Sequence, residues 1–294
     1  MNKPAVAAVK ITKITSTSAD KAHDLLAAEE PLEIRIGYGS LQDRQQKSIS
    51  VTMRTPGHDF ELAIGFLLTE GIIRHPDNIE TIKYCTELNS HEDLQNIVRA
   101  ELKEDIIIDE KKLQRNFYAT SSCGVCGKAS IESIHTICEI LPEANPLLIT
   151  KELIISLPQK LRDSQKVFEY TGGLHACALF DSNGELVLLR EDIGRHNALD
   201  KLIGAGISKF TASGTNKLES YILLLSGRVS FELVQKAAVA GIKVICAIGA
   251  PSSLAVTFAK EFGISLVGFL RDQRFNIYSN EHRISVEKQF AEQK

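Results

Sequence analysis

Short apolar runs that alternate with segments of helical spacing constrain the fold of this chain more than any other feature. Such runs lie at 221–225, 244–248 and 264–269, and segments 230–240 and 252–262 between them carry apolar residues at helical spacing. Strands that are apolar throughout are buried on both faces, and intervening helices provide the crossovers of a parallel sheet. The pattern predicts an α/β domain with a mostly parallel sheet.

The N-terminal third has a different pattern. Alternating apolar residues over 32–55, interrupted by a polar turn, predict a β-hairpin, and 58–73 has helical spacing. Residues 79–85 and 96–102 are strand-like. We therefore predict a smaller α+β domain at 31–116.

The remaining boundaries follow from these two patterns. We predict that the α/β domain spans 117–280 and that 281–294 form a tail. Residues 1–30 mix Ser, Thr, Ala and Lys without a sustained period, and we predict a poorly ordered leader there.

The composition indicates the cellular compartment and the kinds of partner that we expect. The chain has 294 residues, a formal net charge of −3 and six cysteines. Its apolar runs are far too short to cross a bilayer, and the N-terminus lacks the apolar core of a signal peptide, so we expect a cytoplasmic protein with reduced thiols and no membrane partner. The net charge provides no basic field for nucleic acid.

A cysteine pair lies in the middle of the chain. Residues 121–127 read Ser-Ser-Cys-Gly-Val-Cys-Gly, so that Cys123 and Cys126 precede a segment of helical spacing at 131–141. A helix N-terminus favours thiolate over thiol and makes a nearby cysteine more reactive. We take these two cysteines as the candidate catalytic residues.

The pair alone is compatible with half of a zinc site, with a dithiol redox pair and with a sulfur carrier. A structural zinc site needs a second pair of ligands, but the cysteines at 85, 138, 177 and 246 are isolated. A thioredoxin-like pair follows a strand early in a small βαβ unit, whereas this pair lies in a glycine-rich loop. A sulfur carrier uses the same thiolate chemistry as disulfide exchange, and we predict no permanently bound metal.

A histidine enters a predicted strand through two glycines. His175 follows Thr-Gly-Gly-Leu and begins an apolar run, where a histidine is more often a hydrogen-bonded core residue than a ligand. A zinc deaminase would need a glutamate two residues later and a downstream Pro-Cys-x-x-Cys. The residue there is Cys177, so the sequence disfavours deaminase chemistry.

Ionisable residues concentrate at 190–201. Asp192, His196 and Asp200 are four residues apart at a predicted helix start, so we expect them on one helix face. Such a cluster is either a solvated, ion-paired face or a proton-handling site.

The predicted strands end in segments suited to an anion. Glycine permits close approach, serine supplies a hydroxyl and arginine binds phosphate through paired N–H groups. Each segment alone is most often an ordinary turn, but together they indicate a phosphate-bearing ligand at the carboxyl ends of the strands. The candidate residues are Ser226, Gly227, Arg228, the stretch 249–253 and Arg271, Asp272, Gln273 and Arg274.

These motifs resemble those of a known family. From about Glu33 to Tyr278 the chain is similar to the formate dehydrogenase accessory sulfurtransferases, often called FdhD. The motifs that carry the resemblance are Ser-Ser-Cys-Gly-Val-Cys-Gly at 121–127, Thr-Gly-Gly-Leu-His at 171–175, Arg-Glu-Asp-Ile-Gly-Arg-His-Asn-Ala-Leu-Asp-Lys at 190–201, Ser-Gly-Arg-Val-Ser-Phe-Glu at 226–232 and Ala-Pro-Ser-Ser-Leu-Ala at 250–255.

The resemblance implies a function and a fold. It implies a sulfurtransferase that works as a cytosolic homodimer. The enzyme accepts persulfide sulfur from a cysteine desulfurase and passes it to the molybdenum or tungsten bis-molybdopterin guanine dinucleotide cofactor, which then enters formate dehydrogenase. The implied fold resembles that of cytidine deaminases. The alternative is a cofactor-binding chaperone that transfers no sulfur.

The resemblance also assigns residues. It places the persulfide on Cys123 with Cys126 as partner. The guanine dinucleotide contact maps to Phe269, Leu270, Arg271, Asp272, Gln273 and Arg274. We further expect Arg228, Arg271 and Arg274 to hold phosphates, and His175 and His196 to move protons or to hydrogen-bond the pterin.

Overall fold

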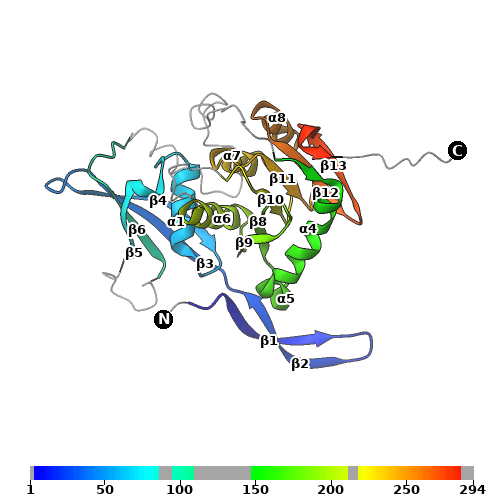
Figure 1. Ribbon diagram of the computed structural model, residues 1–294. Coiled ribbons are helices and arrows are strands. Elements are labelled where there is room, and N and C mark those ends of the chain that lie inside the picture. The colour runs from blue at the N-terminus through cyan, green and yellow to red at the C-terminus, as the bar shows by residue number, and fades with distance from the viewer. Residues whose placement is uncertain (1–2, 86–94, 109–146, 211–217, 286–294) are drawn as a thin grey trace.

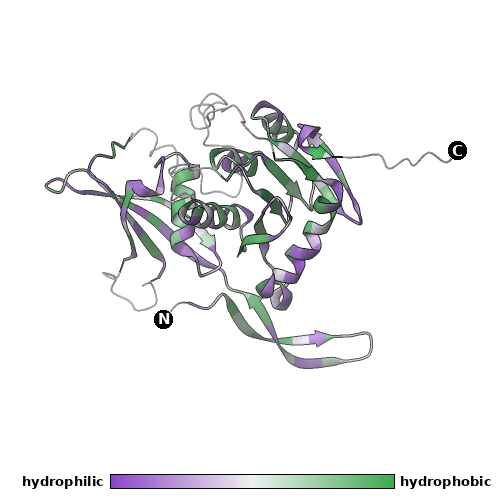
Figure 2. Cartoon of the chain, viewed as in Figure 1, coloured by the Kyte–Doolittle hydropathy of each residue, from purple (hydrophilic) through white to green (hydrophobic). Residues whose placement is uncertain are grey.

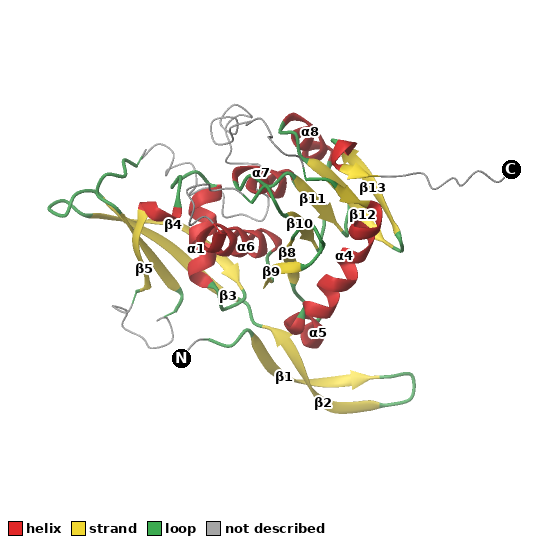
Figure 3. Cartoon of the chain, in the orientation of Figure 1, coloured by secondary structure: helices red, strands yellow, loops and turns green. Residues whose placement is uncertain are grey.

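Two β-sheets with helices between them form the body of the protein (Figures 1 and 3). The computed structural model describes residues 3–85, 95–108, 147–210 and 218–285. A further helix covers the far side of the larger sheet, and a hairpin at the N-terminus extends away from the body (Figure 1). Among the described helices, none combines the length and the apolar character needed to cross a membrane.

The smaller sheet contains four strands in the order β4-β3-β6-β5. Leu32, Ile34 and Ile36 alternate on its buried face, because every second side chain of a strand points to the same side. The predicted hairpin, the helix and the two further strands of this region are confirmed. The elements are β3 (Glu30–Tyr38), β4 (Gln45–Arg54), α1 (Asp59–Thr69), the 3-10 turn η1 (Pro76–Asn78), β5 (Ile79–Tyr84) and β6 (Ile97–Leu102).

The larger sheet contains six strands in the order β13-β12-β11-β10-β8-β9. Strands β10, β11 and β12 are parallel, whereas β8 runs antiparallel to β10 and to β9, and β13 runs antiparallel to β12. The strands are β8 (His175–Phe180), β9 (Leu186–Asp192), β10 (Ile222–Leu225), β11 (Val244–Ala247), β12 (Ser265–Arg271) and β13 (Arg274–Ser279).

The prediction of a mostly parallel sheet is therefore wrong, although its three parallel strands are confirmed. Two tight hairpins, β8–β9 and β12–β13, add antiparallel strands at both edges. A helical crossover can be recognised from the spacing of its apolar residues, whereas a hairpin needs only a short turn, which leaves no such pattern in the sequence. We had expected residues 271–274 to follow the last strand, and they instead make such a turn.

Helices cover both faces of the larger sheet. Along β10, Leu223 and Leu225 belong to one apolar cluster and Ile222 and Leu224 to the other, which explains why the strand is apolar throughout. Figure 2 shows the central strands in the colour of apolar residues and α4 with a largely polar outer side. The helices are α4 (Lys151–Ser164), α5 (Lys166–Thr171), α6 (Arg195–Phe210), α7 (Phe231–Val239) and α8 (Ser253–Glu261).

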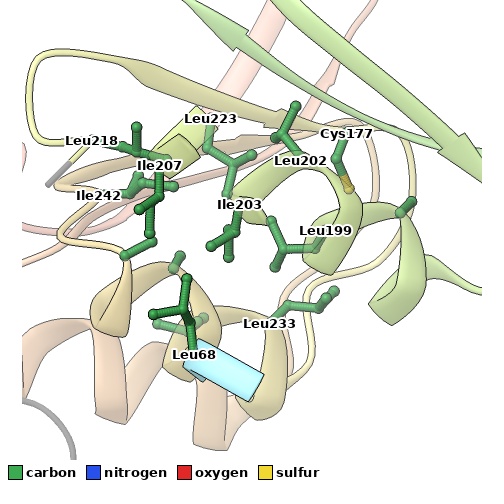
Figure 4. Packing of buried hydrophobic residues seen from close by; sticks show 14 of the residues in the cluster. Leu68, Cys177, Leu199, Leu202, Ile203, Ile207, Leu218, Leu223, Leu233 and Ile242 are labelled. Atoms are coloured by element: carbon green, nitrogen blue, oxygen red, sulfur yellow. The ribbon is translucent and has the colours of Figure 1, made fainter. Parts of the chain in front are cut away.

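One apolar cluster joins the two sheets. It contains α1, α6 and α7 side chains together with residues from both sheets, and Figure 4 shows Leu199, Leu202 and Ile203 of α6 packed toward Leu233 and Leu223. Each such side chain contributes about 1.5–3 kcal/mol of transfer free energy on burial. The two predicted domains therefore share a core, and the boundary at residue 116, which lies outside the described residues, stays a prediction.

Helices α1 and α6 approach closely because glycines line their crossing. A Cβ at Gly65 would collide with the carbonyl oxygen of Asp200, and one at Gly204 would collide with the carbonyl oxygen of Glu61. Only glycine permits such an approach of two backbones. The crossing fixes the N-terminal part of α6 relative to the smaller sheet.

The two chain ends differ from their predictions. Residues expected to form a poorly ordered leader make an antiparallel hairpin of β1 (Val6–Ile14) and β2 (Ala19–Ala27), closed by a turn in which Thr15 N donates to the Ser18 carbonyl oxygen at 2.9 Å. Most of its side chains are exposed, so no buried face imposes the alternation that sequence reading requires.

The predicted tail also begins inside the fold. The 3-10 turn η2 (Glu281–Arg283) leads into β14 (Ile284–Ser285), which pairs in parallel with β7 (Ile149–Thr150). Arg283 is buried and its Nη1 donates to Ser265 Oγ at 3.1 Å. The segment is polar and charged, and its contacts are to residues far away in the sequence. Its local sequence therefore gave no sign that it belongs to the fold.

Candidate functional site

Four strand ends and one strand start meet at one edge of the larger sheet. Strands β9, β10, β11 and β12 end there, and β8 begins there because it is antiparallel to β9 and β10. Backbone hydrogen bonds connect the loops: Ser226 N donates to Ala176 O, Gly249 N to Gly227 O and Phe269 N to Gly249 O, at 3.0, 3.2 and 3.1 Å. The structure thus brings the predicted segments 226–228, 249–253 and 269 together.

His175 is the first residue of β8 and is half-buried at this edge. A Cβ at Gly227 would stand 3.1 Å from its Nδ1, and Ser226 Oγ accepts a hydrogen bond from Ala176 N at 2.9 Å. The glycine and the serine of this loop therefore hold the loop against β8, a packing role that the sequence did not reveal.

The environment of His175 favours the neutral imidazole. Burial lowers the pKa of His175, the positive charge of Arg195 lowers it further, and Asp192, its partner in the β8–β9 register, partly opposes both. A neutral imidazole offers one donor and one acceptor nitrogen. His175 can therefore hydrogen-bond a ligand or take up a proton at neutral pH.

Asp192 ends β9 and serves as a buried anchor. Its carboxylate lies 2.6 Å from Lys201 Nζ and accepts hydrogen bonds from the backbone N–H groups of Thr55 and Gly194, at 3.1 and 2.9 Å. Burial raises the pKa of Asp192, and Lys201 opposes this rise. The network ties the start of α6 to the end of β4, so Asp192 is an anchor for this edge.

Of the predicted helix face of Asp192, His196 and Asp200, only His196 and Asp200 lie on a helix, four residues apart on α6. Asp192 lies on a strand, and Asp200 is buried between α1, α6 and α7, where both its carboxylate oxygens lie 3.0 Å from Lys236 Nζ. His196 remains at the sheet edge, with its Nε2 3.4 Å from Ser230 Oγ. The structure therefore divides the proposed proton-handling cluster into three separate environments.

The segment 190–201 also contains two arginines, and the first of them faces α1. Arg190 makes a two-pronged contact with Glu61, whose carboxylate also lies 3.1 Å from His58 Nδ1. Arg195, the first residue of α6, stays at the site edge, and its Nε is buried with no hydrogen-bond partner. Sequence reasoning did not single out Arg195, although the lack of an acidic residue in the first turn of α6 was an available signal.

The stretch 269–274 forms the β12–β13 hairpin. Phe269 has a φ of 53°, and the turn residues Asp272 and Gln273 have φ of 54° and 61°. Positive φ at both central positions is typical of a type I′ turn, and positive φ is uncommon for non-glycine residues and costs on the order of 1–3 kcal/mol each. Arg271 and Arg274 pair across the hairpin and are exposed together with the turn.

Leu270 differs from the rest of this stretch. Its side chain is 1% exposed and belongs to the apolar cluster under α4. Only its backbone is therefore available to a ligand.

The buried cysteines Cys177 and Cys246 are poorly suited to chemistry, whereas Cys123 and Cys126 lie outside the described residues. Burial in the core raises the pKa of Cys246 to about 12 and also raises that of Cys177. Across the described ranges, no group of three or more His, Cys, Asp or Glu side chains is arranged to hold a metal ion.

Comparisons with known proteins assign the family. A sulfur carrier protein FdhD of Streptomyces avermitilis is 46% identical over 279 residues, which cover 94% of this chain and 95% of that protein. One of Sulfurisphaera tokodaii is 40% identical over 276 residues, 94% and 98% of the two chains.

Solved structures add information on the fold. A formate dehydrogenase accessory protein from Desulfotalea psychrophila aligns with a TM-score of 0.71 and 24% identity over 96% of this chain and 100% of that one, which shows a shared fold. A guanine deaminase from Nitrosomonas europaea aligns with a TM-score of only 0.28, so the likeness to deaminases stays a prediction.

The family model agrees with these relatives. The model described as FdhD/NarQ family matches residues 27–285, which include both sheets and the edge with His175 and Arg195. The predicted family resemblance is thereby confirmed, and the chain belongs to the FdhD/NarQ family.

Proposed function

We propose that this chain is a sulfur carrier that accepts sulfur as a persulfide on Cys123 and delivers it to a bound molybdenum cofactor. The observation that carries the proposal is the 46% identity, over almost the whole of both chains, to a protein named as a sulfur carrier. The donor in this proposal is a cysteine desulfurase, and the acceptor is the bis-molybdopterin guanine dinucleotide cofactor that formate dehydrogenase requires.

The first step is an exchange between sulfur atoms. The thiolate of Cys123 attacks the terminal sulfur of the donor's persulfide, a new S–S bond forms, and the donor cysteine leaves as a thiolate. No net oxidation occurs. In the second step this S–S bond breaks, Cys123 leaves as a thiolate, and the transferred sulfur takes two electrons from a reduced metal centre and becomes its sulfide ligand. Cys126 assists as the neighbouring thiol.

The sheet edge supplies the cofactor site in this proposal. Carboxyl ends of parallel strands and the helix N-termini beside them suit phosphate groups. The exposed guanidinium groups of Arg228, Arg271 and Arg274 bind the diphosphates, and His175 and His196 hydrogen-bond the pterin or move protons. The hairpin that begins at Phe269 contacts the guanine. We further propose a cytoplasmic homodimer with a deaminase-like larger domain.

Mass spectrometry of the sulfurated chain tests the proposal. After incubation with a cysteine desulfurase and cysteine, the peptide that contains residues 121–127 should gain one sulfur atom that cyanide removes. Cys123→Ala should abolish this gain, whereas Cys85→Ala, at a half-buried cysteine outside the proposed site, should retain it.

Activation of formate dehydrogenase in cells provides the second measurement. Cys123→Ala should abolish activation. A variant that still activates the enzyme, together with nucleotide binding and no sulfur on 121–127, would instead indicate a cofactor-binding chaperone.

A further inference from the structure

We propose that Arg195 and the N-terminus of α6 form an anion-binding subsite beside His175, which takes a phosphate group of the ligand. This inference rests on the proposed function, because it assumes that a phosphate-bearing molecule occupies the sheet edge. It adds a partly buried cationic group to the exposed arginines of the hairpin.

Arg195 has an unsatisfied hydrogen-bond donor. Arg195 Nε is buried without a hydrogen-bond partner, and a buried charged donor that lacks a partner is costly. Five other arginines that are not exposed are each paired with a carboxylate: Arg35 with Glu33, Arg44 with Glu101, Arg54 with Asp59, Arg190 with Glu61 and Arg99, whose Nε also has no partner, with Glu101. Arg162, Arg228 and Arg274 are exposed, so water can satisfy their donors.

The acidic residues close to Arg195 in the sequence contact other groups. Asp192 contacts Lys201, Asp200 contacts Lys236, and Glu191 accepts a hydrogen bond from Phe168 N at 3.2 Å. The segment thus contains carboxylates, but the fold directs them away from Arg195. A bound anion would accept the hydrogen bond that Arg195 Nε offers.

The N-terminal end of α6 also favours an anion. Helix α6 spans 16 residues, and its first turn contains Arg195 and His196 but no acidic residue. The N-terminal end of a helix carries partial positive charge, so basic side chains there are unfavourable and an anion is favourable. An anion bound at this end offsets both the helix dipole and the guanidinium charge.

The position of Arg195 indicates which part of a ligand it meets. Arg195 begins α6 three residues after Asp192, which pairs with His175 in the β8–β9 register, and its charge lowers the pKa of His175. His175 in turn lies against Gly227 of the loop after β10. The neighbouring His196 reaches Ser230 at the end of the same loop. The planar fork of donors in arginine matches the oxygens of phosphate. We therefore assign Arg195 to a phosphate rather than to the base or the pterin.

Calorimetric titration of the full-length chain with guanosine diphosphate and with guanosine tests this assignment. Arg195→Gln should weaken guanosine diphosphate binding by at least about tenfold, the loss expected for a charge-assisted hydrogen bond, and should leave guanosine binding unchanged. Arg195→Lys should give an intermediate affinity. Arg162→Gln, which removes an exposed arginine from the end of α4, should bind like the wild type.

Thermal unfolding of the same variants separates binding from structure. Without ligand, Arg195→Gln should raise the melting temperature, because it removes a cation from the positive end of α6; a lower melting temperature would indicate a structural role and overturn the inference.

The outcomes also separate this inference from the proposed function. If guanosine diphosphate binds Arg195→Gln as tightly as the wild type, the inference is wrong while the proposed function stands. If the affinity depends on Arg195 but no sulfur reaches Cys123, the phosphate subsite stands without sulfur transfer.

Discussion

Gly227 lies so close to His175 that a Cβ on the glycine would stand 3.1 Å from Nδ1 of the imidazole. The loop after β10 therefore touches the ring with its backbone, and the position of the ring depends on the absence of a side chain. We expected Gly227 to permit the close approach of a ligand. The contact with His175 gives a second reason for a glycine at this position.

Gly227→Ala should displace the ring of His175 or the loop and weaken guanosine diphosphate binding. We expect the free energy of unfolding to fall by about 1–2 kcal/mol, as for other small overpacking changes. Gly173→Ala is the matched control, because its nearest new contact would be 3.7 Å away. Calorimetry and denaturant unfolding measure both effects; equal results for the two variants would refute the packing role.

The titration of His175 should show the charges that surround it. Burial and then Arg195 hold the pKa of His175 below its ordinary value of 6.5, while Asp192 acts in the opposite direction. Arg195→Gln should therefore raise the pKa of His175 that NMR measures. An unchanged or lower pKa would contradict the proximity of the two charges.

The same shift has a consequence for stability. The folded protein binds the His175 proton less tightly than the unfolded chain does. The contribution of His175 to the free energy of unfolding is therefore fully present above pH 6.5 and is lost as the pH falls through the lower pKa of the folded state. His175→Gln should lose this part of the pH dependence. Denaturant unfolding between pH 5 and about 7.5 measures it.

Sequence reasoning predicted elements whose pattern is local. The three parallel strands, their helices and the smaller sheet appear where periodicity indicated them, because each buries a face or a stripe of its own residues. The N-terminal hairpin buries few side chains, and the β12–β13 turn contains no glycine. Neither element could therefore be predicted from the sequence.

Long-range pairing explains what could not be predicted at the site. Arg190 and Asp200 stand in one charged segment of the sequence, but their partners Glu61 and Lys236 are far from them along the chain. Charge density at 190–201 therefore incorrectly indicated one cluster. The three-dimensional structure was needed to show that Arg195 is the arginine of this segment with an unsatisfied donor.

The glycines at the α1–α6 crossing should be intolerant of any side chain. Gly204→Ala places its Cβ against the backbone carbonyl of Glu61, and we expect a loss of about 2–3 kcal/mol. Gly206→Ala lies on the same helix but meets methyl groups of Leu218 and Leu179 at 3.1 and 3.3 Å, which can move, and the gain in helix propensity offsets part of its cost. A smaller effect of Gly204→Ala than of Gly206→Ala in urea unfolding would contradict the close crossing.

The Glu61–Arg190 contact should make stability depend on pH in the acid range. Burial alone would raise the pKa of Glu61, but Arg190 and His58 outweigh burial and lower the pKa to about 2. Stability from this contact is therefore fully present above the ordinary pKa of 4.5 and is lost as the pH falls toward 2.

Glu61→Gln should cost about 1–2 kcal/mol at pH 7, a figure reduced for the partial exposure of the pair, and the difference from the wild type should vanish near pH 2. Glu185→Gln, which breaks an exposed contact with Lys160, should change stability by less than about 0.5 kcal/mol at any pH. A Glu61→Gln effect that does not vary with pH would exclude the ionic contact as its cause.

The ion pair of Lys236 and Asp200 should be costly to break from one side. Lys236 Nζ lies 3.0 Å from both carboxylate oxygens of Asp200 and 2.8 Å from Thr69 Oγ1, within the core shared by α1, α6 and α7. Lys236→Met should lower the free energy of unfolding by about 3–5 kcal/mol, because it leaves a buried carboxylate without its counter-ion.

The double variant Lys236→Met, Asp200→Asn should recover most of this loss, since the fully buried carboxylate is neutral and the amide can still bond Thr69. Glu70, which also lies 3.1 Å from Lys236 Nζ, keeps its charge but is partly exposed. Burial already raises the pKa of Asp200 in the wild type, and the loss of Lys236 should raise it further. The single variant should therefore gain stability as the pH falls through that raised pKa, whereas the double variant should not. If the single and double variants are equally unstable at all pH values, the cost arises from packing, and the ion pair does not determine the stability of this core.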